Sequence, residues 1–290
     1  MATQNHIRNP LEWGWEHLKQ TGQAFGSAAQ TMEGTWEDRA AAPPTVRRIT
    51  STDIKDALSA GWRDFGAVRT DIVFLCLLYP LAGLVISRMA FDYGMLALVF
   101  PLIAGFALIA PLFGIGLYEI SRRREMGLEA RWTNVFSVVR SPNIGSIMVM
   151  GLLLLAIFCL WLFAANFIYT VTLGPDAPVS TVAFVRDALT TPAGWTMTVV
   201  GIGVGFLFAL VVLVIGVVSF PLLLDRHVGV GTAIATSVRA VRMNPGPMAL
   251  WGLIVAGSLV VGMIPLLVGL AIVLPVLGHA TWHLYRKVVV

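Results

Sequence analysis

Five long runs of residues that carry no Asp, Glu, Lys or Arg divide the chain. A helix needs about 20 mainly apolar residues to cross the hydrocarbon core of a bilayer. In that core every backbone N–H and C=O group must bond within the protein, which favours helices for all the runs. The composition agrees, since 57% of the residues are hydrophobic and 12% are charged. The sequence therefore predicts an all-α polytopic membrane protein. The runs are Ile72–Ser87, Tyr93–Tyr118, Ser141–Pro175, Pro192–Leu224 and Met243–Tyr285.

We expect six membrane-spanning helices, because the last run is too long for one crossing and suits a tight hairpin. Pro265 lies inside that run, lacks a backbone N–H and clashes with the preceding turn, so it is the expected break. A single long helix kinked there is the competing interpretation. The expected spans are Ile72–Met89, Met95–Ile120, Ile144–Leu173, Trp195–Leu224, Pro247–Ile264 and Leu266–Leu284.

An amphipathic segment that ends in Arg precedes each pair of expected spans. These segments are Asp53–Arg69, Glu129–Arg140 and Gly231–Arg242. Recurrence of one unit predicts a duplicated architecture. The predicted fold is three transmembrane hairpins, each preceded by an interfacial amphipathic helix on the cytoplasmic side. The repeats occupy about residues 50–120, 128–224 and 230–286 of a membrane domain that covers residues 46–290.

The distribution of basic residues predicts the orientation, because short cytoplasmic loops carry an excess of Lys and Arg. Only Arg88 and Arg186 lie near the membrane on the expected outer side, so both termini are expected to be cytoplasmic. The one sizeable outer loop follows Gly174, and residues 179–189 are expected to form a short helix there. Arg122, Arg123 and Arg124 are predicted to contact anionic lipid headgroups. The competing interpretation is that the interfacial segments only pack against the ends of the spans, and the two are compatible.

Residues 1–45 form a polar to amphipathic extension without the apolar core of a secretory signal. Leu11, Trp15, Leu18 and Phe25 share one helical face, so residues 9–33 are a candidate partner-binding segment. A mostly disordered tail is the alternative. The expected partners are membrane lipids and a membrane-protein complex. No nucleic-acid partner is expected.

Catalytic motifs are absent from the sequence, so we expect no enzyme activity. The sequence contains no P-loop and no nucleophile elbow, and no pair of carboxylates occurs in a span. Ion-coupled pumps usually need ionisable groups at membrane depth, so the charge-free spans also argue against a pump. The glycines of Gly201–Gly205 follow no strand, and close helix packing explains them better than nucleotide binding.

His279 and His283 are the strongest chemical candidate. Residues at i and i+4 share one helical face, and two imidazoles in that arrangement can bind a metal or one can ligate haem iron. His227 is a third candidate ligand. The favoured interpretation is structural, and no cofactor is expected. A cytoplasmic polar cluster would join the pair to the ends of the spans and to the interfacial segments through Glu119, Asp225, Arg69, Arg140 and Arg242.

Several separated motifs carry a resemblance to a known family. They are Ile49–Phe65 with Gly61-Trp-Arg-Asp-Phe65, Gly116–Glu125, Thr191–Trp195, Phe220–Arg226 and Gly278–Arg286. Over about residues 46–288 the chain resembles an uncharacterised family of proteobacterial integral membrane proteins, domain of unknown function 2189. The resemblance implies a bacterial inner membrane. Some members are labelled putative cytochrome c oxidase subunits. A haem–copper catalytic subunit has many His ligands buried in its spans, and this chain has five His in all, two of them in its N-terminal extension.

Three functions follow as hypotheses. The leading one is a non-catalytic inner-membrane accessory, assembly or scaffold protein with a basic cytoplasmic face. The alternative is a small-molecule permease or a lipid-handling protein. A metal- or haem-binding component of a respiratory chain, with His279 and His283 as ligands, ranks third.

Overall fold

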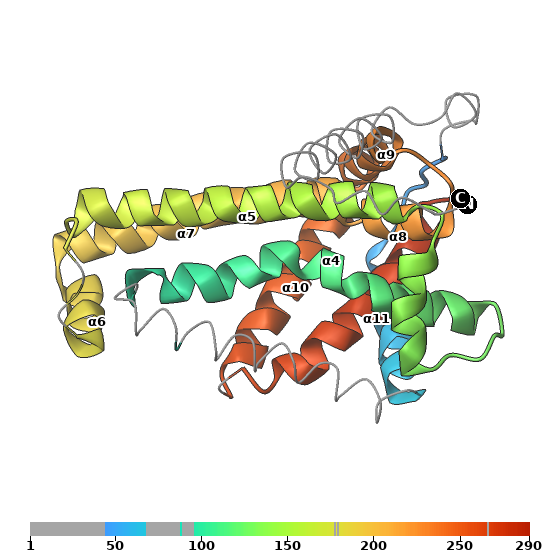
Figure 1. The fold of residues 1–290 in the computed structure, drawn as a ribbon, viewed down its shortest axis with the longest axis horizontal. Coiled ribbons are helices and arrows are strands. Elements are labelled where there is room, and N and C mark those ends of the chain that lie inside the picture. Colours follow the sequence, from blue (N-terminus) through green and yellow to red (C-terminus); the bar gives the residue numbers. More distant parts are fainter. Residues whose placement is uncertain (1–43, 68–87, 89–95, 177, 179, 266) are drawn as a thin grey trace, which may run out of the picture.

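The computed structural model describes residues 44–67, 88, 96–176, 178, 180–265 and 267–290. Within these residues the named elements are all helices, and an isolated antiparallel bridge joins Val46 and Val289 (Figure 1). The predicted partner-binding segment, residues 9–33, lies outside them. The elements are the helical residues 51–67, η1 (Leu96–Leu98), α4 (Val99–Glu125), η2 (Trp132–Arg140), α5 (Ile144–Thr172), α6 (Thr181–Thr190), α7 (Pro192–Gly216), α8 (Ser219–Asp225), α9 (Val230–Met243), α10 (Pro245–Met263) and α11 (Leu270–Val288).

Four helices in the described part of the chain are long and apolar enough to cross a membrane. They are α4, α5, the α7–α8 segment Pro192–Asp225, and α10, and they match the second to fifth expected spans. The first expected span, Ile72–Met89, lies almost entirely outside the described residues. The sixth, Leu266–Leu284, corresponds to α11, which is not among the four because polar and charged side chains fill its C-terminal half. Six spans in three hairpins therefore remain a prediction.

The long C-terminal apolar run forms two helices, as the expected break near Pro265 requires. α10 ends at Met263 and α11 begins at Leu270, and Leu267 between them has a positive φ of 68°. The end of α10 and the start of α11 pack closely, since a Cβ on Gly262 would lie 2.9 Å from the Leu270 side chain. A single kinked helix is therefore the wrong interpretation of this run.

The helices α5 and α7 lie side by side and carry α6 at one end of the molecule, while α8 and α9 lie at the other (Figure 1). Ser180 and Thr191 cap the starts of α6 and α7, so the short helix expected over residues 179–189 is confirmed as α6. The helices α5 and α7 expose large apolar side chains along their length, among them Phe163 and Phe206. Such a surface is stable against lipid or another apolar surface and unfavourable in water.

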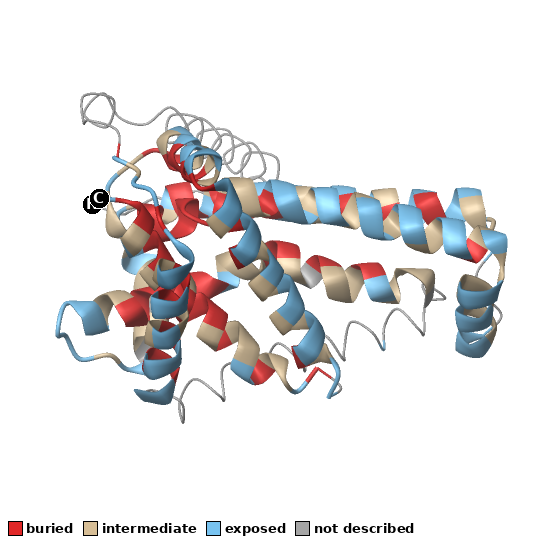
Figure 2. Cartoon of the chain, turned by 180° about the vertical axis from the view of Figure 1, so that it is seen from behind, coloured by how far each residue is buried: buried red, intermediate tan, exposed pale blue. Residues whose placement is uncertain are grey.

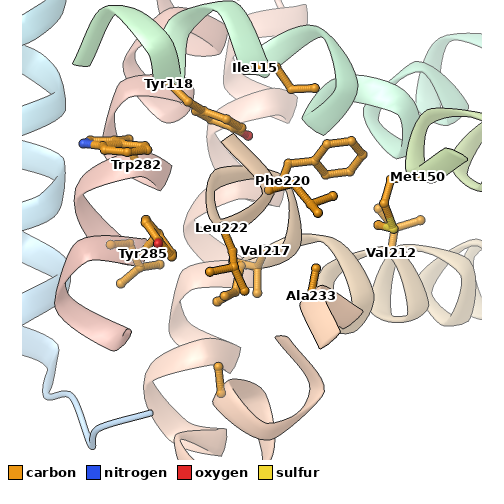
Figure 3. Close-up of a cluster of buried hydrophobic side chains, with 14 of the residues drawn as sticks. Ile115, Tyr118, Met150, Val212, Val217, Phe220, Leu222, Ala233, Trp282 and Tyr285 are labelled. Carbon is orange, nitrogen blue, oxygen red and sulfur yellow. The ribbon is translucent and has the colours of Figure 1, made fainter. Parts of the chain in front are cut away.

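Buried residues concentrate at the opposite end, where helical residues 51–67, the C-terminal parts of α4 and α11, and α8 and α9 meet (Figure 2). We call this region the polar end of the bundle, since it also holds most of the described ion pairs. The short helix α8 is its centre, with every residue from Ser219 to Leu224 buried. Tyr118, Met150, Phe220 and Trp282 bring α4, α5, α8 and α11 into one apolar core (Figure 3).

The three interfacial segments differ in conformation. Residues 51–67 are α-helical, Trp132–Arg140 is a 3-10 helix, and the third segment is α9. One face of α9 is buried through Ala233, Ser237 and Ala240. The second segment is wound more tightly than the other two, so the three segments do not share one conformation. The predicted repeat of whole units remains a prediction.

Candidate functional site

Asp64 is the centre of a polar cluster that joins three segments of the chain. Its Oδ2 accepts a hydrogen bond from Ser121 Oγ at 2.6 Å and lies 2.8 Å from His283 Nε2. Its Oδ1 accepts from Arg124 Nε at 2.9 Å. Asp64 is only 7% exposed, so these contacts replace most of its hydration. We refer to Asp64, Ser121, Arg124, His279 and His283 as the Asp64 cluster.

Close helix packing makes this geometry possible. At Gly61 the helical residues 51–67 approach α11 so closely that a Cβ would lie 2.6 Å from the backbone nitrogen of Ala280. At Gly278 a Cβ would lie 2.5 Å from the Leu117 side chain of α4. The two glycines therefore let three backbones converge, which places the short side chains of Asp64 and Ser121 within reach of both histidines.

His279 is fully buried and completes the cluster. Its Nδ1 lies 2.8 Å from Ser121 Oγ. Because the Ser121 hydroxyl donates to Asp64, its oxygen accepts from His279 Nδ1–H, and in the neutral imidazole this tautomer leaves the lone pair on Nε2. That Nε2 is buried and has no hydrogen-bond partner among the residues that the structure describes. Each histidine thus uses one ring nitrogen for a hydrogen bond within the cluster. The other ring nitrogens, His279 Nε2 and His283 Nδ1, take no part in these bonds.

The electrostatics keep Asp64 ionised. Burial acts to raise the pKa of its carboxyl group, but the hydrogen bonds from His283 and Ser121 and the charge of His283 outweigh burial and lower it below the ordinary 3.8. At neutral pH the cluster therefore holds a carboxylate against the guanidinium of Arg124.

A second network fixes the end of α11 to α4 and α8. Arg286 Nε donates to Glu125 at 2.9 Å, and its Nη1 lies 3.4 Å from Asp225. Trp282 Nε1 and the Tyr285 hydroxyl donate to the same two carboxylates, at 2.9 and 2.7 Å. Burial acts to lower the pKa of Arg286, but the hydrogen bond and charge of Glu125 and the charge of Asp225 raise it overall. Each side chain of α11 that faces these carboxylates is thereby held in place.

The three arginines predicted to contact lipid headgroups each hold a carboxylate. Arg122 and Arg123 bond Glu119 at 2.8 and 2.9 Å, and Arg124 bonds Asp64. Glu119 also lies 3.5 Å from Ser137 Oγ of η2, so it links α4 to the second interfacial segment. The guanidinium groups remain partly exposed, and lipid contact stays a prediction.

The other predicted site residues are dispersed. Arg69 lies outside the described residues. Arg140, Arg242 and His227 are exposed, and no ion pair joins them to other residues in the described part of the chain. Asp225 bonds Tyr285 and Arg286, and no group of three His, Cys, Asp or Glu suited to a metal ion occurs among the described residues. The structure thus brings His279 and His283 together with Asp64 and Ser121, rather than with Arg140 and Arg242.

The buried side chain of Asn244 holds the extended residues near the start of the described chain. Its Oδ1 accepts from the Ile49 backbone N–H at 2.8 Å, and its Nδ2 donates to the Arg47 carbonyl at 3.1 Å. The Arg47 backbone N–H in turn donates to Val288 at 2.9 Å, beside the bridge between Val46 and Val289. Asn244 therefore holds residues 47–49 beside α9, and Arg47 in turn bonds the last residue of α11.

Sequence reasoning missed Asp64 and Ser121. In the structure Trp62 is exposed and Asp64 is buried, because the helical residues 51–67 pack with Gly61 and Asp64 turned toward α4 and α11. A signal was present, since both residues lie in the motifs Gly61–Phe65 and Gly116–Glu125 that carry the family resemblance.

The helical fold and the four candidate spans place the chain in the class of helical integral membrane proteins. The family described as "Predicted integral membrane protein (DUF2189)" matches residues 99–225. The match covers α4 to α8, which is less than half of the 290 residues. It includes two of the five motifs named above and all but the last residue of a third, Phe220–Arg226. A comparison with curated proteins finds no match, and a comparison with solved structures finds none either.

Proposed function

We propose that the chain is a non-catalytic accessory, assembly or scaffold protein of the bacterial inner membrane. The observation that carries this proposal is that the carboxylates of the polar end bond side chains of neighbouring helices. Asp64, Glu125 and Asp225 each bond two or more groups from other elements, so their hydrogen-bonding capacity holds helices together. A rigid polar end on an apolar bundle suits a platform on which another protein docks.

In this proposal α4, α5, α7–α8 and α10 cross the bilayer as four of six spans, and the polar end faces the cytoplasm with both termini. The concentration of Arg and Lys at that end supports the orientation. Residues 44–67, η2 and α9 then lie together at the headgroup level, and residues 9–33 extend the docking surface.

The partner surface is expected to include exposed cations of the polar end. Arg48, Lys55, Arg140 and Arg242 are exposed and make no ion pair within the described residues. Charged groups at the rim of an interface mainly raise association rates and select partners. They are therefore suitable positions at which to weaken docking while leaving the fold intact.

Affinity purification in mild detergent after chemical crosslinking tests the proposal. We expect a protein partner at constant stoichiometry, and we expect the double variant Arg140→Gln/Arg242→Gln to recover less of it. The control is thermal stability in detergent, which the double variant should retain because neither side chain has a described ion pair. Recovery of the chain as a lone monomer under crosslinking conditions would refute a scaffold function.

One observation favours the metal- or haem-binding alternative. The buried Nε2 of His279 has no described partner, and a neutral imidazole whose Nδ1–H is held by a hydrogen bond is the form that ligates metals. His283 Nε2, however, is committed to Asp64. We therefore rank this function below the scaffold, as we also rank a permease or lipid-handling protein.

A further inference from the structure

A surface cleft of about 390 Å³ lies between the helical residues 51–67 and the end of α11. Its volume falls within the usual range of small-ligand sites. The Asp64 cluster adjoins it, because His283 forms part of the wall. The lining residues are Asp56, Ser59, Ala60, Arg63, His283, Arg286 and Lys287.

The cleft is lined by three cations and one carboxylate, and each cation makes at least one hydrogen bond or ion pair within the protein. Lys287 Nζ lies 3.0 Å from Asp56 on the rim and 3.4 Å from Asp53 outside the lining. Arg286 is held by Glu125 and Asp225, on the side of α11 that faces α4 and α8. Arg63 Nη1 donates to Ser59 Oγ at 2.9 Å. A ligand that enters the cleft therefore has little side-chain ordering to impose.

Several donors in this cleft remain available. A guanidinium has five N–H donors. Arg63 uses one of them for Ser59 and pairs with no carboxylate among the described residues. Arg286 uses Nε and Nη1 for its two carboxylates, which leaves Nη2. Donors thus come from both walls, which a ligand with several acceptor oxygens can satisfy together.

The surroundings indicate where such a ligand comes from. Trp62 precedes Arg63 and is 58% exposed. Exposed Trp side chains favour the membrane–water interface, with the ring at headgroup level. Arg63 then lies at the depth of lipid phosphates. Arg binds carboxylates and phosphates alike in bidentate fashion, but a phosphate has further oxygens that can accept from the other donors of the cleft.

We propose that this cleft binds a phosphate group, presented by an anionic phospholipid headgroup, through Arg63, Ser59, Arg286 and Lys287. A soluble phosphate compound has the same chemistry and is the other source that the test distinguishes. Lipid binding needs no protein partner, so it can be measured on the purified chain alone. Failure to find a protein partner would leave this result unaffected.

The test measures binding of dioleoyl phosphatidylglycerol to the detergent-purified protein by native mass spectrometry. Dioleoylglycerol, which has the same acyl chains and no phosphate, is the lipid control. We expect one saturable phosphatidylglycerol site, weakened about fivefold or more by Arg63→Gln, since the variant removes charge-assisted hydrogen bonds from the guanidinium to phosphate oxygens. Lys55→Gln is the matched protein control, because Lys55 is an exposed cation of the same helix outside the cleft, and it should bind as the unmodified chain does.

The remaining outcomes separate the sources and the classes of ligand. Binding of inorganic phosphate that depends on Arg63, without lipid binding, would keep the phosphate site and assign it a soluble ligand. Ser59→Ala should weaken binding about threefold and serves as the second variant if Arg63→Gln loses thermal stability. Equal weakening by Arg63→Gln and Lys55→Gln would overturn the proposal, as would glutarate binding as tightly as phosphate.

Discussion

Replacing Asp64 by Asn tests whether the Asp64 cluster holds the polar end together. The substitution keeps the size of the side chain and removes its charge. Asn offers one acceptor oxygen where the carboxylate serves Ser121, Arg124 and His283. Removing one partner of a buried ion pair costs about 3–5 kcal/mol. Because the Arg124 side chain is 35% exposed and can recover hydration, we expect the lower end, about 3 kcal/mol.

The measurement is the free energy of unfolding by SDS in mixed micelles, followed by circular dichroism. Asp56→Asn is the matched control on the same helix. Asp56 pairs with Lys287 at 3.0 Å, but its side chain is 59% exposed, and exposed ion pairs contribute about 0–1 kcal/mol. A loss for Asp64→Asn no larger than that for Asp56→Asn would show that the cluster does not stabilise the fold.

The pH dependence gives an independent check on the same residue. Since the folded pKa of Asp64 lies below 3.8, the unfolded chain binds its proton first as the pH falls. The stability that Asp64 contributes is therefore complete above pH 3.8 and is lost as the pH falls through the lower folded pKa. The acid limb of the stability curve should be shallower in Asp64→Asn than in the unmodified chain, and identical limbs would contradict the assigned ion pairing.

Three further predictions concern packing, the histidines and orientation. Gly61→Ala should destabilise the chain by about 1–3 kcal/mol, because its Cβ would meet Ala280. Gly66→Ala has open space and should be neutral or stabilising by up to about 1 kcal/mol. Unfolding of both variants in SDS is the measurement, and equal effects would contradict the close approach at Gly61. His279→Gln/His283→Gln should lower thermal stability, at about 1–3 kcal/mol for each lost hydrogen bond, and leave metal content and the absorbance spectrum unchanged. A stoichiometric metal or haem signal that disappears in that variant would favour the ligand interpretation. Asp176→Cys should react with an impermeant maleimide from outside and Gly127→Cys only after the membrane is opened, with the reverse result excluding the proposed orientation.

Much of the helical framework follows from the charge-free runs. Long uncharged apolar sequences have few ways to satisfy their backbone, so the spans at α4, α5 and α7–α8 were predicted to within a few residues. The break before α11 and the short helix α6 were signalled by Pro265, Gly174 and the residues around Pro192. The 3-10 winding of η2 was not signalled, because its apolar spacing resembles that of an α-helix.

The candidate site was predictable only in part. His279 and His283 stand out in the sequence because the i,i+4 spacing is local. Their partners come from residues 158 and 219 positions away, and no local pattern reveals which side chains will meet there. Arg124 illustrates the difficulty, since a run of three arginines at the end of a span suggests lipid contact, while the fold pairs each of them with a carboxylate.

The placement of His283 and Arg286 so late in the chain has a consequence for biosynthesis. Asp64 and His283 are 219 positions apart, which at about 5–20 residues per second means an interval of about 10 to 45 s between their synthesis. During that interval Glu125 and Asp225 also wait for α11, which supplies Trp282, Tyr285 and Arg286 to them. One helix therefore completes all three carboxylate sites in a single late step. A chain that stops before α11 leaves Glu125 and Asp225 without these donors and Asp64 without His283, so it exposes carboxylates that the finished protein covers.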